Sequence, residues 1–522
     1  MIQKNCLFII LISFLSACAS LPPNDQQPSY QLNGTENSPL AINKSKSKRN
    51  SNASDENTGL LLLGDSDNAL VARLALARVA EQSLDVQYYL FHDDLSGRLL
   101  IRELLRAADR GVRVRILVDD MNMSGRDHGL AVISAHNNIE LRIFNPFIRG
   151  QSRLVQLITG LGSVTRRMHN KSFIADNQVA IVGGRNIGDE YFGADAEVYF
   201  GDLDVMMTNP AAREVSTEFD LYWNNPLAYP AEILIKEKPS QLALKQMDSE
   251  LEAFIVKQLK LGNKYLTRLK NDDFVSRLKS GKTEYYWGKA EVLYDDPDKI
   301  RANRDQKSFN LTPKLLTYFS SLKSELVVIS PYFVPGTSGV QFFSQLVERG
   351  VKVKILTNSL MSNDVPIVHS GYVKYRKKLL EAGITVYEID KALLEKDWVR
   401  QKSEFPGDGI GSSKASLHAK YFILDRAQAF IGSLNVDPRS IVENTEIGVV
   451  IDAPELALQL AEDFDEFVKE IAFQVKLKDG NIEWHGRKRD GTLKVFHNEP
   501  YSTWWDRFSV AVMRLLPVEL QL

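Results

Sequence analysis

One polar pattern occurs twice in this chain, and it constrains the fold more than any other feature of the sequence. The first copy, HNKSFIADNQVAIVGGRN, begins at His169, and the second, HAKYFILDRAQAFIGSLN, begins 249 residues later at His418. In each copy apolar residues separate a histidine, a lysine and an aspartate, and a Gly-Gly or Gly-Ser step and an asparagine follow. Two copies of one constellation predict a single active site built from two similar halves of the chain.

The pattern is too specific to arise readily by chance. With 8 histidines in the chain, about 0.03 occurrences of His-x-Lys-x4-Asp are expected at random. A glutamate also follows each histidine at the same offset of 28 residues. The repeated positions are His169, Lys171, Asp176, Gly184, Asn186 and Glu197 in the first copy, and His418, Lys420, Asp425, Ser433, Asn435 and Glu446 in the second.

These residue types suit a site that holds phosphate. Side chains alternate between the two faces of a strand, so a strand over residues 169–173 places His169 and Lys171 on one side. Two lysines and two asparagine amides around one centre match the spread negative charge of a phosphoryl transition state. Glycine lets the backbone pass close to a ligand. The predicted phosphate-binding residues are Gly184, Asn186, Ser433 and Asn435.

We expect neither a metal nor a cofactor. The lysine beside each histidine repels a cation, and the sequence has no HExxH motif and no cluster of cysteines. The two cysteines, Cys6 and Cys18, both lie near the N-terminus, so the folded body has no disulfide.

The hydrophobic pattern predicts an α/β fold. Residues 84–90, 99–110 and 112–118 have the pattern of a strand, a helix and a strand, which is typical of a parallel layer. The same strand–helix–strand pattern occurs again around residues 326–356. The sequence RGVRVRIL of the first pattern corresponds to RGVKVKIL in the second, which indicates an internal repeat. A chain of 522 residues is expected to form two domains. The predicted parts are a lipoprotein signal peptide (1–17), a disordered tether (18–58), a first domain (59–225), a helical connector or insertion (226–310), a second domain (311–475), and C-terminal strands with an amphipathic helix (476–522).

The N-terminus indicates export and a lipid anchor. A lysine precedes a short apolar run over residues 6–15, which is long enough for a signal peptide and too short to span a bilayer. The sequence Leu-Ser-Ala-Cys that follows resembles the bacterial lipobox, in which the cysteine, here Cys18, is lipidated. The resemblance to bacterial lipoproteins implies an outer-membrane destination, because alanine and not aspartate follows the cysteine at Ala19. The alternative is a plain secretory signal.

Two further features bear on binding partners. The tail over residues 502–516 carries aromatic and basic residues at helical spacing, which fits a membrane interface. It fits equally well a C-terminal helix that packs on the core. A formal net charge of −2 gives no general reason to expect a nucleic acid partner.

The two motifs resemble the HKD motifs of the phospholipase D superfamily. The stretches LDVQYY, GGRNIGDEYFGA and NVDPRS extend this similarity, which is to the bacterial cardiolipin synthase C type of that superfamily. The resemblance implies two similar α/β/α domains that form a pseudo-two-fold, bilobal body with one shared active site. It runs from about residue 60 to the C-terminus.

The resemblance also implies roles for the repeated residues. One histidine, His169 by preference, attacks phosphorus and forms a phosphohistidine, and His418 acts as general acid and base. The sequence alone does not decide which histidine is the nucleophile. Glu197 and Glu446 are expected to orient the imidazoles, whereas the aspartates are structural supports. A further residue, His369 in VHSGY, either lines the acceptor pocket or is a helix-face histidine with a local hydrogen bond.

The leading functional hypothesis is a phosphatidyl transferase. It makes cardiolipin from phosphatidylglycerol and a second phospholipid, either phosphatidylglycerol or phosphatidylethanolamine. The alternatives are a hydrolytic phospholipase D that releases phosphatidic acid, a metal-independent nuclease, and a lipoprotein scaffold without activity. The expected partners are phospholipids and a membrane, and the expected location is the periplasmic side of the cell envelope.

Overall fold

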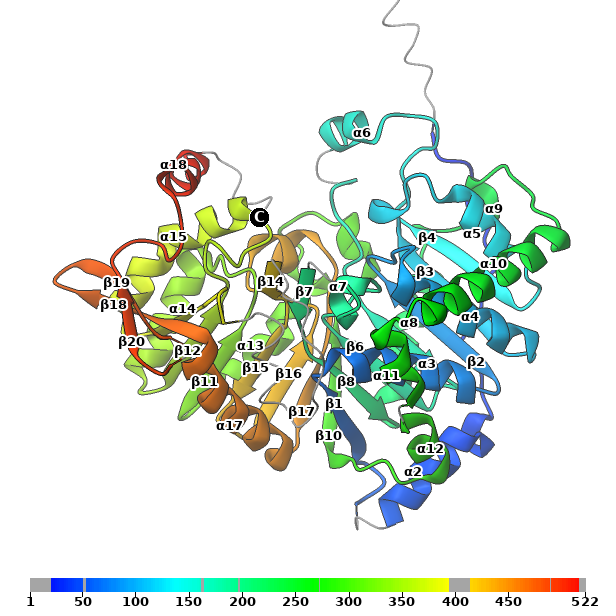
Figure 1. Ribbon diagram of the computed structural model, residues 1–522, viewed down its shortest axis with the longest axis horizontal. Coiled ribbons are helices and arrows are strands. Elements are labelled where there is room, and N and C mark those ends of the chain that lie inside the picture. The colour runs from blue at the N-terminus through cyan, green and yellow to red at the C-terminus, as the bar shows by residue number, and fades with distance from the viewer. Residues whose placement is uncertain are drawn as a thin grey trace, which may run out of the picture.

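The computed structural model describes residues 20–49, 53–160, 164–195, 198–271, 273–393, 414–488 and 490–515. Two lobes of α/β/α architecture lie side by side, the first mainly blue to teal and the second green to red (Figure 1). Their strands join into one 18-stranded sheet. The bilobal α/β body predicted from the repeat is confirmed.

The first lobe has three parallel strands flanked by antiparallel ones. Its spatial order is β1 (Thr58–Leu63), β8 (Asp204–Thr208), β6 (Val179–Gly183), β5 (Ser172–Ala175), β2 (Ser83–Tyr88), β3 (Arg113–Asp119), β4 (Ile139–Phe144) and β9 (Ala228–Pro230).

The second lobe repeats this order strand by strand. It consists of β10 (Tyr286–Tyr294), β17 (Ile447–Asp452), β16 (Gln428–Gly432), β15 (Tyr421–Leu424), β11 (Glu325–Ile329), β12 (Lys352–Thr357), β13 (Thr385–Ile389) and β18 (Ala472–Lys478), extended by β19 (Asn481–Arg487) and β20 (Leu493–Phe496). The related sequences RGVRVRIL and RGVKVKIL lead into the equivalent strands β3 and β12.

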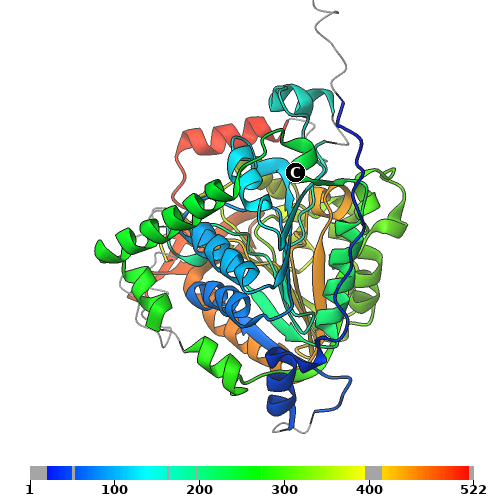
Figure 2. The same cartoon turned by 90° about the vertical axis from the view of Figure 1, so that its right-hand side faces the viewer.

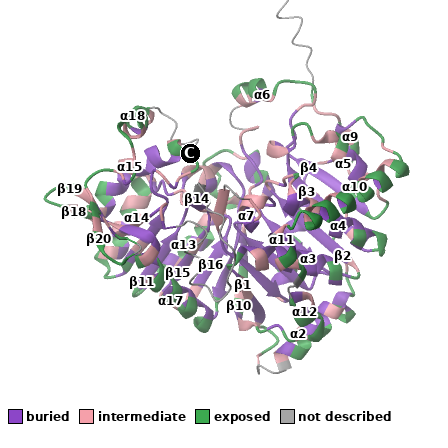
Figure 3. Cartoon of the chain, viewed as in Figure 1, coloured by how far each residue is buried: buried purple, intermediate pink, exposed green. Residues whose placement is uncertain are grey.

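Helices cover both faces of the sheet. The outer faces carry α3 (Ser66–Val79), α4 (Leu95–Asp109) and α5 (Asp127–Ser134) on the first lobe and α13 (Thr312–Ser320), α14 (Gly336–Glu348) and α15 (Pro366–Glu381) on the second. Between the lobes, α8 (Ala211–Trp223) and α17 (Pro454–Ile471) pack into one apolar core with strands of both lobes. Figure 3 shows this buried centre in purple. The lobes therefore share a core and do not fold as separate units.

The remaining elements are short or peripheral. They are α2 (Pro39–Arg49), α6 (Arg153–Thr159), α7 (Asp189–Phe192), α9 (Ala231–Leu234), α10 (Gln241–Lys260), α11 (Lys264–Asn271), α12 (Phe274–Ser280), α18 (Trp504–Met513), the single turns η1 (Thr35–Asn37), η2 (Asp120–Asn122), η3 (Pro297–Ile300), η4 (Lys307–Phe309) and η5 (Arg439–Glu443), and the strand pair β7 (Val198–Gly201) and β14 (Lys414–Leu417).

Strand β3 shows how alternation builds two layers. Val114, Ile116 and Val118 face the outer core, while Arg115 points to the other side of the sheet. Arg115 is fully buried, and it is tolerated there because its guanidinium pairs with Asp85 at 2.6 Å and with Asp220 of α8 at 2.8 Å. Removing one partner of such a buried pair costs about 3–5 kcal/mol, so this contact fixes α8 on the sheet.

The predicted connector over residues 226–310 needs a correction. It contains the expected helices α9 to α12, but it ends in strand β10, which pairs with β1 of the first lobe and with β17 of the second. β10 takes the place in the second lobe that β1 takes in the first. The second lobe therefore begins at Tyr286 and not at residue 311.

The predicted disordered tether over residues 18–58 is wrong for the part that the structure describes. The Asn24 side chain donates to the carbonyl of Pro226 at 2.9 Å, and the Gln31 amide donates to Asp220 at 2.8 Å. Farther along, the Ser47 hydroxyl in α2 donates to the carbonyl of Gly281. The segment binds the first lobe mainly through polar groups, so its low apolar content gave no sign of order. Figure 2 shows it as a blue strap along the first lobe.

The C-terminal part contains strands β19 and β20 and helix α18, as the sequence predicts. Within the described ranges, no helix has both the length and the apolar composition that a bilayer-spanning helix requires.

Candidate active site

The two motif histidines approach each other from opposite lobes. His169 leads into β5, and His418 lies between β14 and β15. The regular strand expected over residues 169–173 begins only at Ser172, so His169 and Lys171 lie in the segment before it.

The backbone at each histidine is bound to the other lobe. The amide of His169 donates to the carbonyl of Thr445 at 2.9 Å, and the amide of His418 donates to the carbonyl of Gly201 at 2.7 Å. The pairing of β7 with β14 extends the second contact. These bonds hold both imidazoles at the junction of the lobes.

Each imidazole also contacts a carboxylate from the other lobe. Nδ1 of His169 lies 2.8 Å from Oε2 of Glu446, and Nδ1 of His418 lies 2.6 Å from Oδ2 of Asp202. A carboxylate at Nδ1 favours the tautomer that leaves Nε2 unprotonated, which is the form that can act as nucleophile or base. Glu446 therefore meets the histidine of the opposite copy and not that of its own copy.

Asp202 was not among the residues predicted from the sequence. Glu197, which was predicted, lies outside the described residues. Strand register supplies the signal that a constant offset missed: Gly183 pairs with Asp204 in the first lobe and Gly432 with Gly448 in the second. Counting back two residues from each partner leads to Asp202 and to Glu446, which are therefore structural equivalents.

The two lysines occupy the same centre. Nζ of Lys171 donates to the carbonyl of His169 at 2.6 Å, and Nζ of Lys420 donates to the carbonyl of His418 at 2.5 Å. Burial is the main cause that lowers the pKa of both lysines, that of Lys171 to about 7, and Lys420 lowers the pKa of Lys171 further. This mutual repulsion shows that two cationic groups converge on one spot, where an anion relieves it.

Burial and the lysines also act on the histidines. Burial, followed by Lys171 and Lys420, lowers the pKa of His169 well below its ordinary value. Burial and Lys420 lower the pKa of His418, and Asp202 opposes them. Both imidazoles are therefore neutral at pH 7 before a phosphate binds.

The two orienting carboxylates differ in their ionisation. Burial raises the pKa of Glu446 to about 7. Burial acts in the same direction on Asp202, but His418, Lys420 and Arg185 outweigh it and hold the pKa of Asp202 well below its usual range. Asp202 is therefore an anion at every pH of interest, and Glu446 exchanges its proton near neutrality.

The two motif aspartates lie at the far ends of the hairpins from the histidines. Asp176 accepts hydrogen bonds from the amides of Glu81, Gln82 and Ser83, and Asp425 accepts them from the amides of residues 323–325. Both have positive φ angles, 51° and 52°, in the turn after the motif strand. They tie that turn to β2 in the first lobe and to β11 in the second.

The four predicted phosphate-binding residues have different environments in the structure. Asn186 is engaged within the first lobe, since its side chain accepts from the amide of Leu90 at 3.1 Å and donates to Tyr191 at 3.0 Å. Its counterpart Asn435 is buried, and its Oδ1 has no partner among the described residues. The hydroxyl of Ser433 donates to Glu446. At Gly184 a Cβ atom would lie 2.3 Å from Asp202, so only glycine fits beside that carboxylate.

Aromatic rings form walls around the histidines. The ring of Tyr89 lies edge-on to His169 with centroids 5.0 Å apart. Tyr191 approaches His418 in the same way at 5.2 Å, and Phe200 stacks on it at 5.4 Å. These rings limit water around the imidazoles and restrict their rotation.

Two other groups of titratable residues lie apart from the histidine pair. His369 is buried on α15, and its Nε2 lies 3.6 Å from Glu499, so the structure provides an acidic partner for it. His92, Asp94 and Glu190 place their potential ligand atoms within 4.8 Å of one another. A hydrogen bond with Glu190 is the main cause that raises the pKa of His92.

Comparison with known proteins assigns the family. A family model described as "Cardiolipin synthase, PLD-like domain" matches residues 73–223 and 315–468. Cardiolipin synthase C of Escherichia coli (strain K12) is 41% identical over 463 residues, which cover 88% of this chain and 95% of that protein. An uncharacterized protein of Helicobacter pylori (strain J99) is 31% identical over 99% of both chains.

A solved structure agrees on the fold. The phosphatidylserine synthase of Haemophilus influenzae Rd KW20 superposes with a TM-score of 0.55 at 14% sequence identity and covers 92% of this chain and 100% of that one. At this identity the likeness concerns the fold alone. The family model, however, covers the cores of both lobes and both histidines. The chain therefore belongs to the phospholipase D superfamily, in its cardiolipin synthase-like branch of phosphatidyl-transferring enzymes.

Proposed function

We propose that the protein makes cardiolipin by transferring a phosphatidyl group from one phospholipid to the free glycerol hydroxyl of phosphatidylglycerol. The donor is phosphatidylglycerol, which loses glycerol, or phosphatidylethanolamine, which loses ethanolamine. The crossed His–carboxylate pairs around two buried lysines are the observation that carries this proposal. The 41% identity to a cardiolipin synthase C over most of both chains supports the choice of substrate.

In the first step Nε2 of His169 attacks the phosphorus of the donor. A P–N bond forms while the P–O bond to the headgroup alcohol breaks, and the leaving oxygen takes a proton from His418. His169 suits the nucleophile because its pKa is held well below its ordinary value, so its lone pair is free. Asp202, which stays ionised, stabilises the imidazolium form of His418 that must donate this proton.

In the second step the acceptor displaces the histidine. His418, now neutral, takes the proton from the glycerol hydroxyl of phosphatidylglycerol, whose oxygen attacks phosphorus as the P–N bond breaks. The products are cardiolipin and free His169. Lys171 and Lys420 hold the non-bridging oxygens in both steps, and their charge is worth most in this buried, low-dielectric position.

A lipid product assay tests this proposal. Purified protein is incubated with phosphatidylglycerol vesicles, with and without phosphatidylethanolamine, and cardiolipin, glycerol, ethanolamine and phosphatidic acid are quantified. We expect cardiolipin and one released alcohol per turnover, and none with His169→Ala or His418→Ala. Phosphatidic acid as the sole lipid product would replace transfer by hydrolysis, because water and a lipid alcohol compete for the same intermediate.

The covalent step has its own test. Protein quenched at alkaline pH during turnover is analysed by mass spectrometry, since phosphohistidine survives base and not acid. We expect a phosphatidyl adduct on the peptide that contains His169. An adduct on the peptide of His418 would reverse the roles of the two histidines.

The same proposal includes a location. Cys18, outside the described residues, is the acylated residue of a lipoprotein, and Ala19 directs the protein to the outer membrane with its body in the periplasm. Labelling of cells with a fatty acid analogue is expected to mark the wild-type chain and not Cys18→Ala. Equal labelling of both chains would exclude lipidation at this cysteine.

A further inference from the structure

Helix α18 exposes a cluster of aromatic rings. Trp504, Trp505 and Phe508 lie on one side of the helix, and Trp505 is 69% exposed. The rings of Trp504 and Phe508 stack at 5.1 Å, so the cluster is ordered among its own members. The opposite side of α18 packs against α15 and buries Val510. A capping box between Thr503 and Asp506 fixes the start of the helix, which is therefore a built element and not a loose tail.

Helix α6 exposes an apolar face of the same form on the other lobe. Leu154, Val155 and Ile158 repeat the spacing of the aromatic cluster, and Leu154 is 67% exposed. A helix on a water-soluble surface normally turns such a face inward. Here the apolar face points outward because the polar side is the one that is attached to the body.

Two polar side chains of α6 bind it to the body of the first lobe. Gln156 is buried, and its amide both donates to the carbonyl of Ile148 and accepts from its amide, at 3.0 Å and 2.8 Å. Arg153 pairs with Asp120 at 2.9 Å. These bonds fix the rotation of α6 and leave its apolar side without a partner among the described residues.

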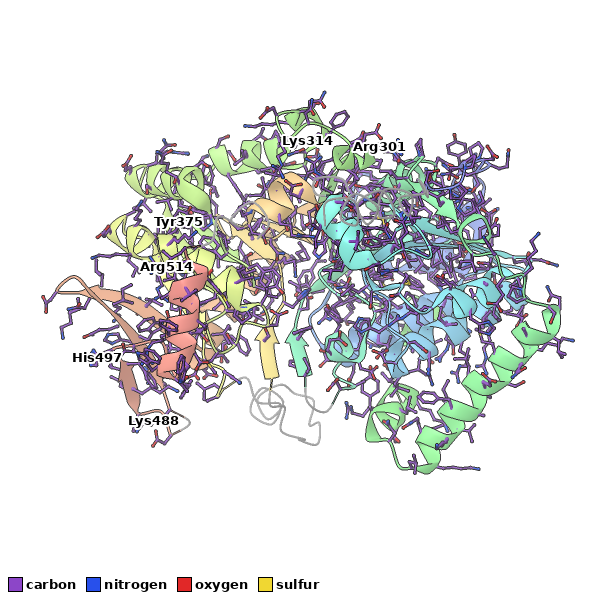
Figure 4. The ribbon with its side chains drawn as sticks, turned by 90° about the horizontal axis from the view of Figure 1, so that it is seen from above. Arg301, Lys314, Tyr375, Lys488, His497 and Arg514 are labelled. Atoms are coloured by element: carbon purple, nitrogen blue, oxygen red, sulfur yellow. The ribbon has the colours of Figure 1, made fainter. Side chains whose placement is uncertain are left out.

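Both helices project from the same side of the molecule. They lie at the top of the body in two perpendicular views (Figures 1 and 2), and both are largely green in Figure 3, which marks exposure. Seen from above in Figure 4, α18, which ends at the labelled Arg514, lies at the outer part of the second lobe. The strand pair β7 and β14, which leads to His418, lies below the two helices in Figure 1 and between them in the horizontal direction. The blue start of the described chain, a few residues after Cys18, also lies on this side beside α6.

We propose that α6 and α18 are paired membrane contacts, one on each lobe, that seat the enzyme on a phospholipid bilayer with the histidine site facing it. Tryptophan is favoured at the level of the lipid headgroups, where its ring meets the acyl boundary and its N–H stays wet. The leucine, valine and isoleucine side chains of α6 enter the acyl boundary itself. Two contacts on opposite sides of the site fix both the distance and the tilt of the enzyme. This proposal rests on the proposed function, because a lipid substrate is what gives the seat a purpose.

Tryptophan quenching by brominated phospholipids tests the seat. The full chain is bound to vesicles of phosphatidylglycerol and phosphatidylethanolamine with brominated acyl chains. We expect the emission of Trp504 and Trp505 to fall, because indole rings are favoured at the headgroup level, close to the brominated acyl chains. The variant Trp504→Phe/Trp505→Phe keeps an apolar face and removes that emission, so it identifies the quenched signal.

In that background, Ile158→Trp reports on α6. Its matched control is Leu261→Trp, which replaces an apolar residue that is 71% exposed at the end of α10, a helix that lies below α6 in Figures 1 and 2. We expect quenching at position 158 and none at 261. Equal quenching at both positions would contradict the proposed membrane contact of α6. Burial of the two helices in a dimer, detected by light scattering, would contradict it as well.

Activity on two physical forms of the lipid separates the seat from the chemistry. In Leu154→Ser/Val155→Ser/Ile158→Ser we expect about a tenfold loss of transfer on vesicles, because surface binding scales with buried apolar area. We expect no change on a short-chain phosphatidylglycerol that is dissolved as monomers. An equal loss on both forms would contradict a membrane role for α6. If the wild-type chain showed no transfer on vesicles or on the dissolved lipid, the proposed function would be disproved. The quenching experiment would still show whether α6 and α18 contact the membrane.

Discussion

Asp202 and His418 come from opposite lobes, and Oδ2 of the carboxylate lies 2.6 Å from Nδ1 of the imidazole. Glu446 and His169 form the counterpart of this pair at 2.8 Å. In both cases the carbonyl of the residue just before the carboxylate, Gly201 or Thr445, accepts a hydrogen bond from the backbone amide of the same histidine. Each lobe thus supplies the histidine of one pair and the carboxylate of the other, so neither lobe alone contains a complete His–carboxylate pair.

This relationship predicts the effect of Asp202→Asn. The amide keeps the shape of the carboxylate but does not stabilise an imidazolium, and it allows the wrong tautomer of His418. We expect kcat to fall by about ten-thousandfold, as for another carboxylate that orients a catalytic histidine. Because Asp202 opposes the lowering of the pKa of His418, its loss should also move the corresponding limb of the pH–rate profile to lower pH.

Two comparisons make the result on Asp202 specific. Asp248→Asn, at an exposed position on α10, controls for the loss of a negative charge and should leave kcat unchanged. Glu197→Gln tests the residue that equal sequence spacing favours. A larger loss with Glu197→Gln than with Asp202→Asn would contradict the equivalence drawn from strand register.

Local patterns in the sequence were enough for much of the fold. The strand over residues 112–118 was predicted to within one residue of its observed bounds, Arg113–Asp119, because its apolar residues form a short continuous run. Strand β10 was missed because it lies in a Lys/Glu-rich stretch and its partners, β1 and β17, are distant in the sequence. The N-terminal segment was missed for a related reason, since hydrogen bonds from polar side chains leave no hydrophobic period.

The site shows the same division. His169, Lys171 and their counterparts were predicted because the motif is local and repeated. The contact of each carboxylate with the histidine of the other lobe was not predicted, because it depends on how the two lobes pack against each other. The two lobes also differ in the length of the segment that leads from the motif to β8 or β17, so a constant offset from the histidine does not lead to Asp202.

Lys171 predicts a pH dependence of substrate binding. Burial lowers its pKa to about 7, so the side chain loses its charge as the pH rises above neutrality. We expect KM for phosphatidylglycerol to rise by up to about tenfold per pH unit above pH 7. Lys171→Arg keeps its charge throughout, so its KM should be flat over pH 7 to 9, whatever its kcat.

The control for Lys171 is Lys352→Arg at an exposed position in β12, which should retain the wild-type pH dependence of KM. A steep rise of KM in Lys171→Arg, matching the wild type, would assign the titration to another group.

Glu218 predicts a pH dependence of stability. It is fully buried on α8, where it accepts a hydrogen bond from Asn170 at 2.8 Å, and burial raises its pKa to about 8. A carboxyl group with a raised pKa in the folded state costs stability as the pH climbs from its unfolded value through the folded one. We therefore expect Glu218→Gln to gain about 3 kcal/mol over the wild type between pH 6 and pH 9, at about 1.4 kcal/mol per pH unit up to pH 8.

Urea unfolding at both pH values measures this difference, and exposed Glu250→Gln on α10 serves as the control. A gap between wild type and Glu218→Gln that stays constant with pH would show that Glu218 is ionised in the folded protein.

Asp425 separates a structural from a catalytic aspartate in the motif. Its carboxylate accepts from the amides of residues 323–325 and from the Ser324 hydroxyl, and its own φ is 52°. Asp425→Ala leaves these donors without an acceptor and places alanine in a left-handed turn, so we expect a loss of about 2–4 kcal/mol in the free energy of unfolding. Asp425→Asn keeps one acceptor oxygen and tolerates that φ, so its loss of stability should be about half as large.

The activity of the same variants is the second test. Well below the melting temperature, kcat of both variants should stay within about tenfold of the wild type, with an unchanged pH profile, because general acid–base groups typically contribute 10²–10⁴-fold. A thousandfold loss of kcat in a fully folded Asp425→Asn would place this carboxylate in the chemistry instead of the fold.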